Sequence, residues 1–111
     1  AEYIVWGSNG DMPISRPVGC LPGVYRYANP QNRIHVTEKP LPLMREIIKI
    51  CVPGGRILDP FCGAGITVLA SVLEGYEAVG IEVTDAYYKL GVDRVRFALE
   101  AQEKSEDTAD Q

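Results

Sequence analysis

The chain has 111 residues, of which 46% are hydrophobic and 23% charged, and its formal net charge is −4 at pH 7. This composition is typical of one globular domain and excludes a fibrous or wholly disordered chain. No apolar run approaches the roughly 20 residues of a membrane span, and no signal-peptide pattern is present, so we expect a cytoplasmic protein without a membrane segment.

The charge is unevenly distributed along the chain. Residues 11–50 hold six Lys or Arg against three acids, whereas residues 100–111 hold five acids against one Lys. We therefore expect a domain over residues 1–103 and a disordered acidic tail over residues 104–111. The three cysteines lack the spacing of a zinc site, and the chain has one histidine, so we expect reduced thiols and no metal.

The first part of the chain combines a predicted strand with a long loop. Residues 2–6 are β-branched and aromatic and predict a buried strand. Residues 11–34 are rich in Pro and Gly and predict a loop, in which arginines and tyrosines alternate. That mixture suits contact with phosphates and bases, although an ordinary surface loop has the same composition. The candidate nucleic-acid contacts are Arg16, Tyr25, Arg26, Tyr27 and Arg33.

The remaining residues predict alternating helices and strands. Helical spacing of apolar residues indicates helices over 41–52 and 66–74 and a third that begins at Thr84 or Asp85. Residues 57–58 and 78–81 are apolar runs typical of strands buried on both faces. This order predicts an α/β fold with a parallel sheet and flanking helices. The apolar stripe expected on the third helix is Tyr88, Val92, Val95 and Leu99.

A glycine turn between the first of these strands and its helix is the candidate ligand site. Gly63 and Gly65 allow a sharp turn and leave the backbone open to a ligand beyond the carboxyl end of the strand. Glu82 ends the next strand, where a carboxylate can accept the hydroxyls of a ribose. Val68 stands where a dinucleotide fingerprint has its third glycine. S-adenosylmethionine is therefore favoured over NAD, and a nicotinamide dehydrogenase remains the alternative.

Three motifs in order strengthen this interpretation. His35-Val36-Thr37-Glu38-Lys39-Pro40 precedes Asp59-Pro60-Phe61-Cys62-Gly63-Ala64-Gly65, and Gly80-Ile81-Glu82 follows. Together they resemble the amino-methylating DNA methyltransferases, which make N6-methyladenine or N4-methylcytosine. The resemblance implies a Rossmann-type methyltransferase fold, S-adenosylmethionine as cofactor and double-stranded DNA as substrate.

The resemblance also implies roles for individual residues. Phe61 would pack against the cofactor and Glu82 would bind its ribose. Thr37 and Lys39 would face its methionine carboxylate, while His35 would order the turn that carries them. The expected cofactor-binding residues are His35, Thr37, Lys39, Asp59, Pro60, Phe61, Cys62, Gly63, Ala64, Gly65, Thr67 and Glu82.

One motif of that family has no match in these 111 residues. The family catalyses with a [D/S/N]-P-P-[Y/F/W] tetrapeptide, which is absent, so we name no catalytic residue. We expect the chain to be the carboxyl-terminal, cofactor-binding part of a longer methyltransferase, inactive alone and paired with the amino-terminal part or with itself. The alternative is a non-catalytic module that binds a nucleoside cofactor or another protein.

Overall fold

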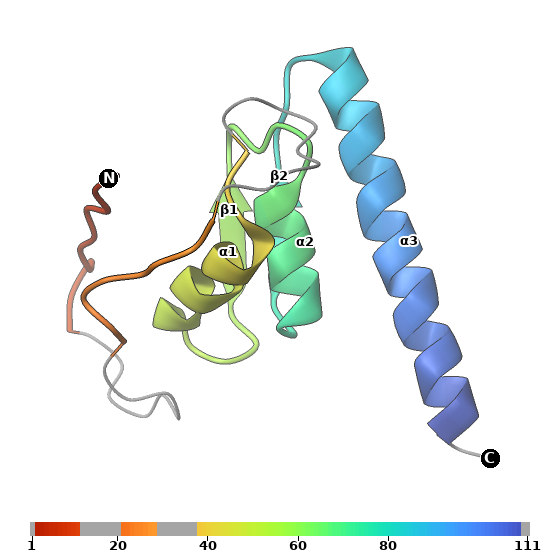
Figure 1. The fold of residues 1–111 in the computed structure, drawn as a ribbon, viewed down its shortest axis with the longest axis horizontal. Helices are drawn as coiled ribbons and strands as arrows, with labels where there is room; N and C mark the ends of the chain where they lie inside the picture. The colour runs from red at the N-terminus through yellow and green to blue at the C-terminus, as the bar shows by residue number, and fades with distance from the viewer. Residues whose placement is uncertain (1, 12–20, 29–37, 110–111) are drawn as a thin grey trace.

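The computed structural model describes residues 2–11, 21–28 and 38–109. In these residues the chain forms α1 (Leu41–Ile47), a 3₁₀ turn η1 (Ile48–Ile50), β1 (Arg56–Asp59), α2 (Ile66–Leu73), β2 (Glu77–Gly80) and α3 (Asp85–Ala109) (Figure 1). The alternating order of helices and strands from residue 41 onward is confirmed.

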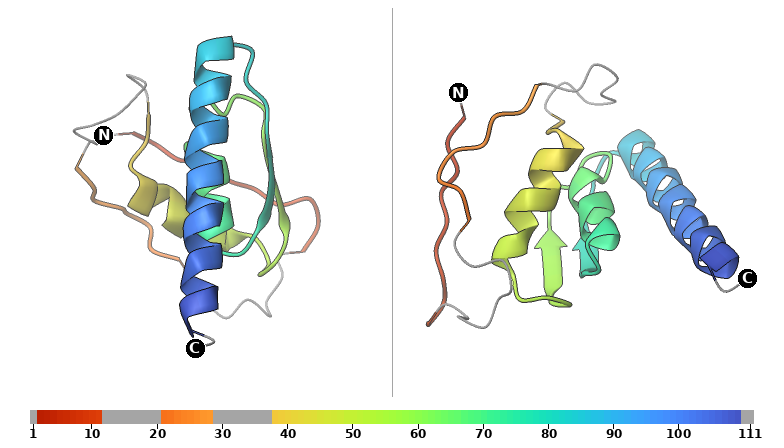
Figure 2. Two further views of the ribbon diagram at one scale, coloured as in Figure 1. Left: turned by 90° about the vertical axis from the view of Figure 1, so that its right-hand side faces the viewer. Right: turned by 60° about the horizontal axis from the view of Figure 1, so that its bottom comes forward.

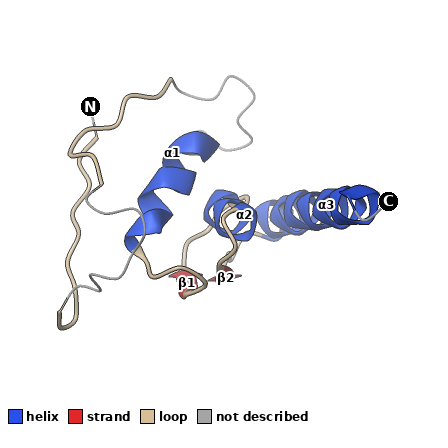
Figure 3. Ribbon diagram, turned by 90° about the horizontal axis from the view of Figure 1, so that it is seen from below, coloured by secondary structure: helices blue, strands red, loops and turns tan. Residues whose placement is uncertain are grey.

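The two strands form a parallel sheet in which Leu58 is opposite Val79 and Asp59 is opposite Gly80. The helices lie on one face of this sheet (Figure 3). Side chains alternate across a strand, and Leu58 and Val79 are 64% and 61% exposed on the other face. The expectation that both faces are buried is therefore wrong for the described residues, because helices cover only one of them.

The helices α1 and α2 pack together above the sheet. Pro42 stands in the first turn of α1, where its missing N–H is not needed, and the last turn narrows into η1. The buried residues gather on α2, the turn before it and their neighbours: Pro40, Ile48, Ala64, Gly65, Thr67, Ala70, Ser71 and Gly91. Arg45 Nε lies 2.6 Å from Glu74 Oε1 and joins the two helices at their surface.

The helix α3 runs beside α2 and continues well beyond it (Figure 2). It reaches Ala109, so the prediction of disorder from residue 104 is wrong for 104–109. Lys104, Glu106 and Ala109 are good helix formers, and charge alone does not prevent this segment from continuing a helix. Residues 110–111 lie outside the described residues.

The packing face of α3 contains two of the four predicted stripe residues, Val92 and Val95, but not Tyr88 and Leu99. Tyr88 and Leu99 are exposed, and Val92 and Val95 are half-buried. Gly91 is buried, and Tyr87, Arg94 and Ala98 are half-buried beside it. Because Gly91 and Ala98 have small side chains, α3 can approach its neighbours closely at these positions. A search for large apolar residues at helical spacing does not find such contacts.

Residues 2–11 and 21–28 form neither helix nor strand. The predicted strand at residues 2–6 is therefore wrong: these residues are exposed, and the described sheet contains only β1 and β2. β-branched and aromatic residues favour a strand only where a neighbouring strand supplies hydrogen bonds. Irregular backbone at 21–28 agrees with the predicted loop, and the rest of that loop beyond residue 11 lies outside the described residues. No helix in the described ranges has the length and apolarity needed to cross a membrane.

Candidate functional site

The turn between β1 and α2 depends on two glycines with positive φ. Gly63 has φ +55° and Gly65 has φ +84°, a region that other L-residues rarely adopt. The N–H of Gly65 donates to the carbonyl of Cys62 at 2.9 Å, and the carbonyl of Gly65 accepts from Leu69 N at 2.8 Å as the first turn of α2. The predicted glycine turn is thus confirmed as the entry to α2.

Hydrogen bonds tie this turn to the end of β2. Ile81 N donates to the Asp59 carbonyl at 2.9 Å, and Cys62 N donates to the Ile81 carbonyl at 3.0 Å. The Asp59 side chain accepts from Phe61 N at 3.0 Å, which satisfies the turn locally. The carboxyl ends of both strands are therefore held side by side.

Glu82 connects the two loops through its side chain. Its Oε1 accepts a hydrogen bond from Gly63 N at 2.9 Å, and its Oε2 accepts one from Thr84 N at 2.8 Å. The carboxylate is thus fixed at the junction of the glycine turn and the start of α3. A carboxylate has about four acceptor positions, so this role is compatible with accepting hydroxyl groups of a ligand.

A cleft of about 440 Å³ opens at this junction. That volume lies within the range of small-molecule sites. The predicted site residues that line it are Lys39, Asp59, Phe61, Cys62, Gly63, Ala64, Thr67 and Glu82. Pro60 and Gly65 belong to the same turn but not to the lining, and His35 and Thr37 lie outside the described residues.

Three lining residues were not among the predicted ones: Glu38, Met44 and Ile66. Glu38 directly precedes Lys39, so its place in the motif was a usable signal. Met44 is on the apolar stripe of α1, and Ile66 begins α2. The helical spacing of apolar residues predicts only that these two side chains face the interior, and not that they line the cleft.

Lys39 carries the positive charge of the cleft. Its Nζ lies 2.6 Å from Glu2 Oε2, and both side chains are substantially exposed. The hydrogen bond from Lys39, followed by its charge, lowers the pKa of Glu2 below the ordinary 4.5. Lys39 in this structure therefore already holds a carboxylate.

Cys62 contributes a half-buried thiol to the cleft. Burial raises its pKa above the ordinary 9.0, and the charges of Asp59 and Glu82 raise it further. The thiol therefore stays protonated at neutral pH and is a weak nucleophile. Its sulfur packs against Gly80, where an added Cβ would lie 2.7 Å from it. Cys51 and Cys62 are both free thiols, and Cys20 is outside the described residues.

The described nucleic-acid candidates lie away from this cleft. Tyr25 is half-buried, whereas Arg26 and Tyr27 are exposed, and none of the three lines the cleft. Arg16 and Arg33 lie outside the described residues.

Comparison with known proteins places most of the chain in one group. The model of the N6/N4 DNA methylase family matches residues 5–93. DNA adenine methyltransferase YhdJ of Escherichia coli K12 is 35% identical over 74 residues, which cover 66% of this chain and 25% of YhdJ. Type II methyltransferase M.ScaI of Streptomyces caespitosus is 39% identical over 72 residues, covering 64% of this chain and 22% of M.ScaI.

A solved structure matches the fold as well. The crystal structure of the M1.HpyAVI complex with S-adenosylmethionine has 30% sequence identity and a TM-score of 0.55, and the match covers 67% of this chain and 41% of that one. The present chain thus spans between about a fifth and two fifths of these proteins.

Proposed function

Because this chain belongs to the N6/N4 family of DNA methylases, we propose that it is the cofactor-binding part of an S-adenosylmethionine-dependent DNA amino-methyltransferase. The methyl group would go to N6 of adenine or N4 of cytosine. The chain has a partial Rossmann-type methyltransferase fold, with a small parallel sheet and flanking helices. The single observation that carries the proposal is the Glu82 carboxylate, which joins the glycine turn to the loop after β2.

The chemistry of the cleft suits S-adenosylmethionine. This cofactor carries ribose hydroxyls, a carboxylate and two positively charged groups. The lining offers the carboxylates of Asp59 and Glu82 and the ammonium of Lys39. Carboxylates attract cations and accept hydrogen bonds from hydroxyls, whereas an ammonium pairs with a carboxylate. The ribose hydroxyls, the carboxylate and the positive charges of the cofactor therefore each have a complementary group in the lining.

We assign the residues as follows. Glu82 would accept the ribose hydroxyls, and its orientation is already fixed by two backbone N–H groups. Phe61, whose ring is exposed at the cleft, would pack against the cofactor. Gly63 and Ala64 would bring backbone close to the methionine part. Lys39 would exchange the exposed Glu2 carboxylate for that of the cofactor. His35 and Thr37 would complete the same end of the cleft.

When bound, S-adenosylmethionine supplies an activated methyl group. The residues of this chain would hold that donor in a fixed orientation, which is the main requirement for transfer to a positioned amine. The [D/S/N]-P-P-[Y/F/W] tetrapeptide, which holds the target base in the family that the sequence resembles, is absent from these 111 residues. We therefore assign that task to another part of the parent protein. A non-catalytic cofactor-binding or protein-interaction module is the alternative that this absence favours.

The open face of the sheet supports pairing with another polypeptide part. Leu58 and Val79 form an exposed apolar pair there, and parallel sheets are normally covered on both faces. The chain spans only part of its relatives, so the rest of a parent protein is the proposed cover, with self-association as the second choice. Double-stranded DNA would reach the complex beside Tyr25, Arg26 and Tyr27, together with Arg16 and Arg33. Action on DNA also favours a cytoplasmic location.

Titration calorimetry with S-adenosylhomocysteine and with NAD tests this proposal. S-adenosylhomocysteine keeps the nucleoside and the amino-acid part of the cofactor, so we expect it to bind. NAD should give no heat, because Val68 replaces the third glycine of a dinucleotide fingerprint. Binding of NAD alone would contradict the proposed function.

A further inference from the structure

The helix α3 contacts the cleft at its glycine turn. Gly91 is buried against Ala64 and Gly65, and a Cβ added to Gly91 would lie 3.2 Å from both the carbonyl carbon and the oxygen of Ala64. A Cβ on Gly65 would lie 3.3 Å from the Cα of Gly91. The backbones of α3 and the turn therefore touch directly, and this contact fixes where α3 stands relative to the cleft.

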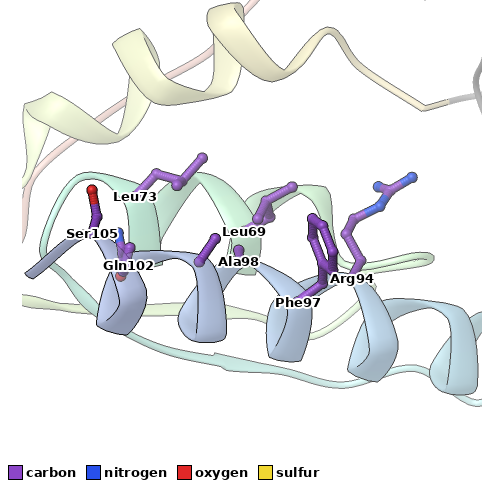
Figure 4. A pocket seen from close by; sticks show the side chains of 8 residues that line it. Leu69, Leu73, Arg94, Phe97, Ala98, Gln102 and Ser105 are labelled. Atoms are coloured by element: carbon purple, nitrogen blue, oxygen red, sulfur yellow. The ribbon is translucent and has the colours of Figure 1, made fainter. Parts of the chain in front are cut away.

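One helical turn later, α3 contacts a second part of the lining of the same cleft. The guanidinium of Arg94 forms an ion pair with the carboxylate of Glu38, through Nη1 and Oε1. The helices α2 and α3 line an apolar groove with Leu69, Leu73, Phe97 and Ala98. In Figure 4, Arg94 lies at one end of this groove, and its guanidinium points away from the other groove residues. Residues 38–40 precede α1 and form no helix or strand, so regular secondary structure does not hold them in place.

This ion pair is unlike the others in the described ranges. The side chains of Glu38 and Arg94 are 6% and 19% exposed, which makes it the most buried of the ion pairs in the described part of the chain. A buried ion pair adds little stability compared with apolar side chains of the same size, because both charges lose their water. It does constrain the geometry of its two partners, since separating them removes a compensating charge from a buried group. Here the partner that it orients is the residue next to Lys39.

We propose that Arg94 is a positioning residue for the methyl-donor site. Its ion pair with Glu38 holds residues 38–40 beside the glycine turn, so that Lys39 faces the amino-acid end of the cofactor. With Gly91 against the turn and Arg94 against Glu38, α3 fixes the glycine turn and residues 38–40 relative to one another. This inference rests on the proposed function, because it requires a ligand whose carboxylate Lys39 binds.

Two ligands separate this role from a purely structural one. S-adenosylhomocysteine has the methionine-derived carboxylate, whereas 5′-methylthioadenosine has the nucleoside and sulfur without the amino-acid part. Calorimetry would measure both with the unaltered protein and with Arg94→Gln. We expect the substitution to weaken S-adenosylhomocysteine binding about tenfold and to leave 5′-methylthioadenosine binding within about twofold, because only the former uses Lys39.

A matched control breaks a different ion pair. Arg45→Gln removes the pair between α1 and α2, and Arg45 does not line the cleft. We expect it to leave the affinity for both ligands unchanged. Arg94→Lys keeps the positive charge and should restore most of the affinity for S-adenosylhomocysteine. In Lys39→Gln, adding Arg94→Gln should cause no further loss, because the group through which Arg94 acts is already gone.

The possible outcomes are distinct. Equal weakening of both ligands by Arg94→Gln, or no weakening of either, would overturn the positioning role while leaving the proposed function intact. Failure of the unaltered protein to bind S-adenosylhomocysteine would overturn the proposed function first and this inference with it. If Arg94→Gln does not fold, Arg94→Met removes the same ion pair with a side chain of similar length, and its effect on the two ligands decides in the same way.

Discussion

The glycine turn at residues 59–65 and the amino-terminal segment at residues 2–8 both have sequences typical of parts of a parallel sheet. Only the turn adopts the predicted conformation. The turn is held by backbone bonds to Ile81, by the Glu82 carboxylate and by close contact with α3. The segment is exposed throughout, although Tyr3, Val5 and Trp6 are strong strand formers. A turn carries its own structural requirements in a few residues, whereas a strand depends on a neighbour.

The largest expected effect comes from crowding the turn at Gly65. Gly65→Ala combines an unfavourable φ of +84° with a Cβ 3.3 Å from the Cα of Gly91. We expect a loss of about 2–4 kcal/mol in the free energy of unfolding, measured by urea denaturation. Gly75→Ala is the control, because its φ is +81° and a Cβ there would meet nothing within 4 Å. Equal losses in the two variants would show that the contact with α3 contributes nothing.

A smaller loss is expected where β2 packs against the turn. A Cβ on Gly80 would lie 2.7 Å from Cys62 Sγ and from Val68 Cγ2, so Gly80→Ala should cost about 1–3 kcal/mol. Gly7→Ala in the amino-terminal segment, with nothing within 4 Å, should change stability by less than about 0.5 kcal/mol. Thermal unfolding of both variants measures the contrast. A Gly7→Ala loss as large as that of Gly80→Ala would mean that the segment is packed.

The smallest effect concerns the ion pair of Glu2, in the amino-terminal segment, with Lys39, which lines the same cleft as the glycine turn. The pKa of Glu2 is lowered in the folded chain, so the stabilisation is present above pH 4.5 and is lost as the pH falls through the lowered value. Because both side chains are exposed, the change in stability should be close to the error of measurement. An NMR titration should find that Lys39→Gln returns the Glu2 pKa toward 4.5. An unchanged pKa in that variant would contradict the pair.

The sequence was sufficient for the parts of the fold that local chemistry determines. The positions of α1 and α2 follow from helical spacing, from Pro42 and from the glycines after each helix. The position of the cleft follows from the glycine turn together with Asp59 and Glu82. It failed where tertiary contacts decide: the strand at residues 2–6, the second face of the sheet and the packing stripe of α3. Gly91 and Arg94 were missed because an isolated glycine and an arginine interrupt an apolar pattern, and only the fold shows what they touch.

The central claim is that Glu82 binds the ribose of an adenosine cofactor at the glycine turn, and affinity in the Glu82→Ala variant tests it most directly. Calorimetry with S-adenosylhomocysteine would compare this variant with the unaltered protein, after circular dichroism has shown that both are folded. We expect a loss of roughly 10- to 150-fold, equivalent to the loss of about one charge-assisted hydrogen bond. An unchanged affinity in the folded variant would contradict the claim and remove Glu82 from the site.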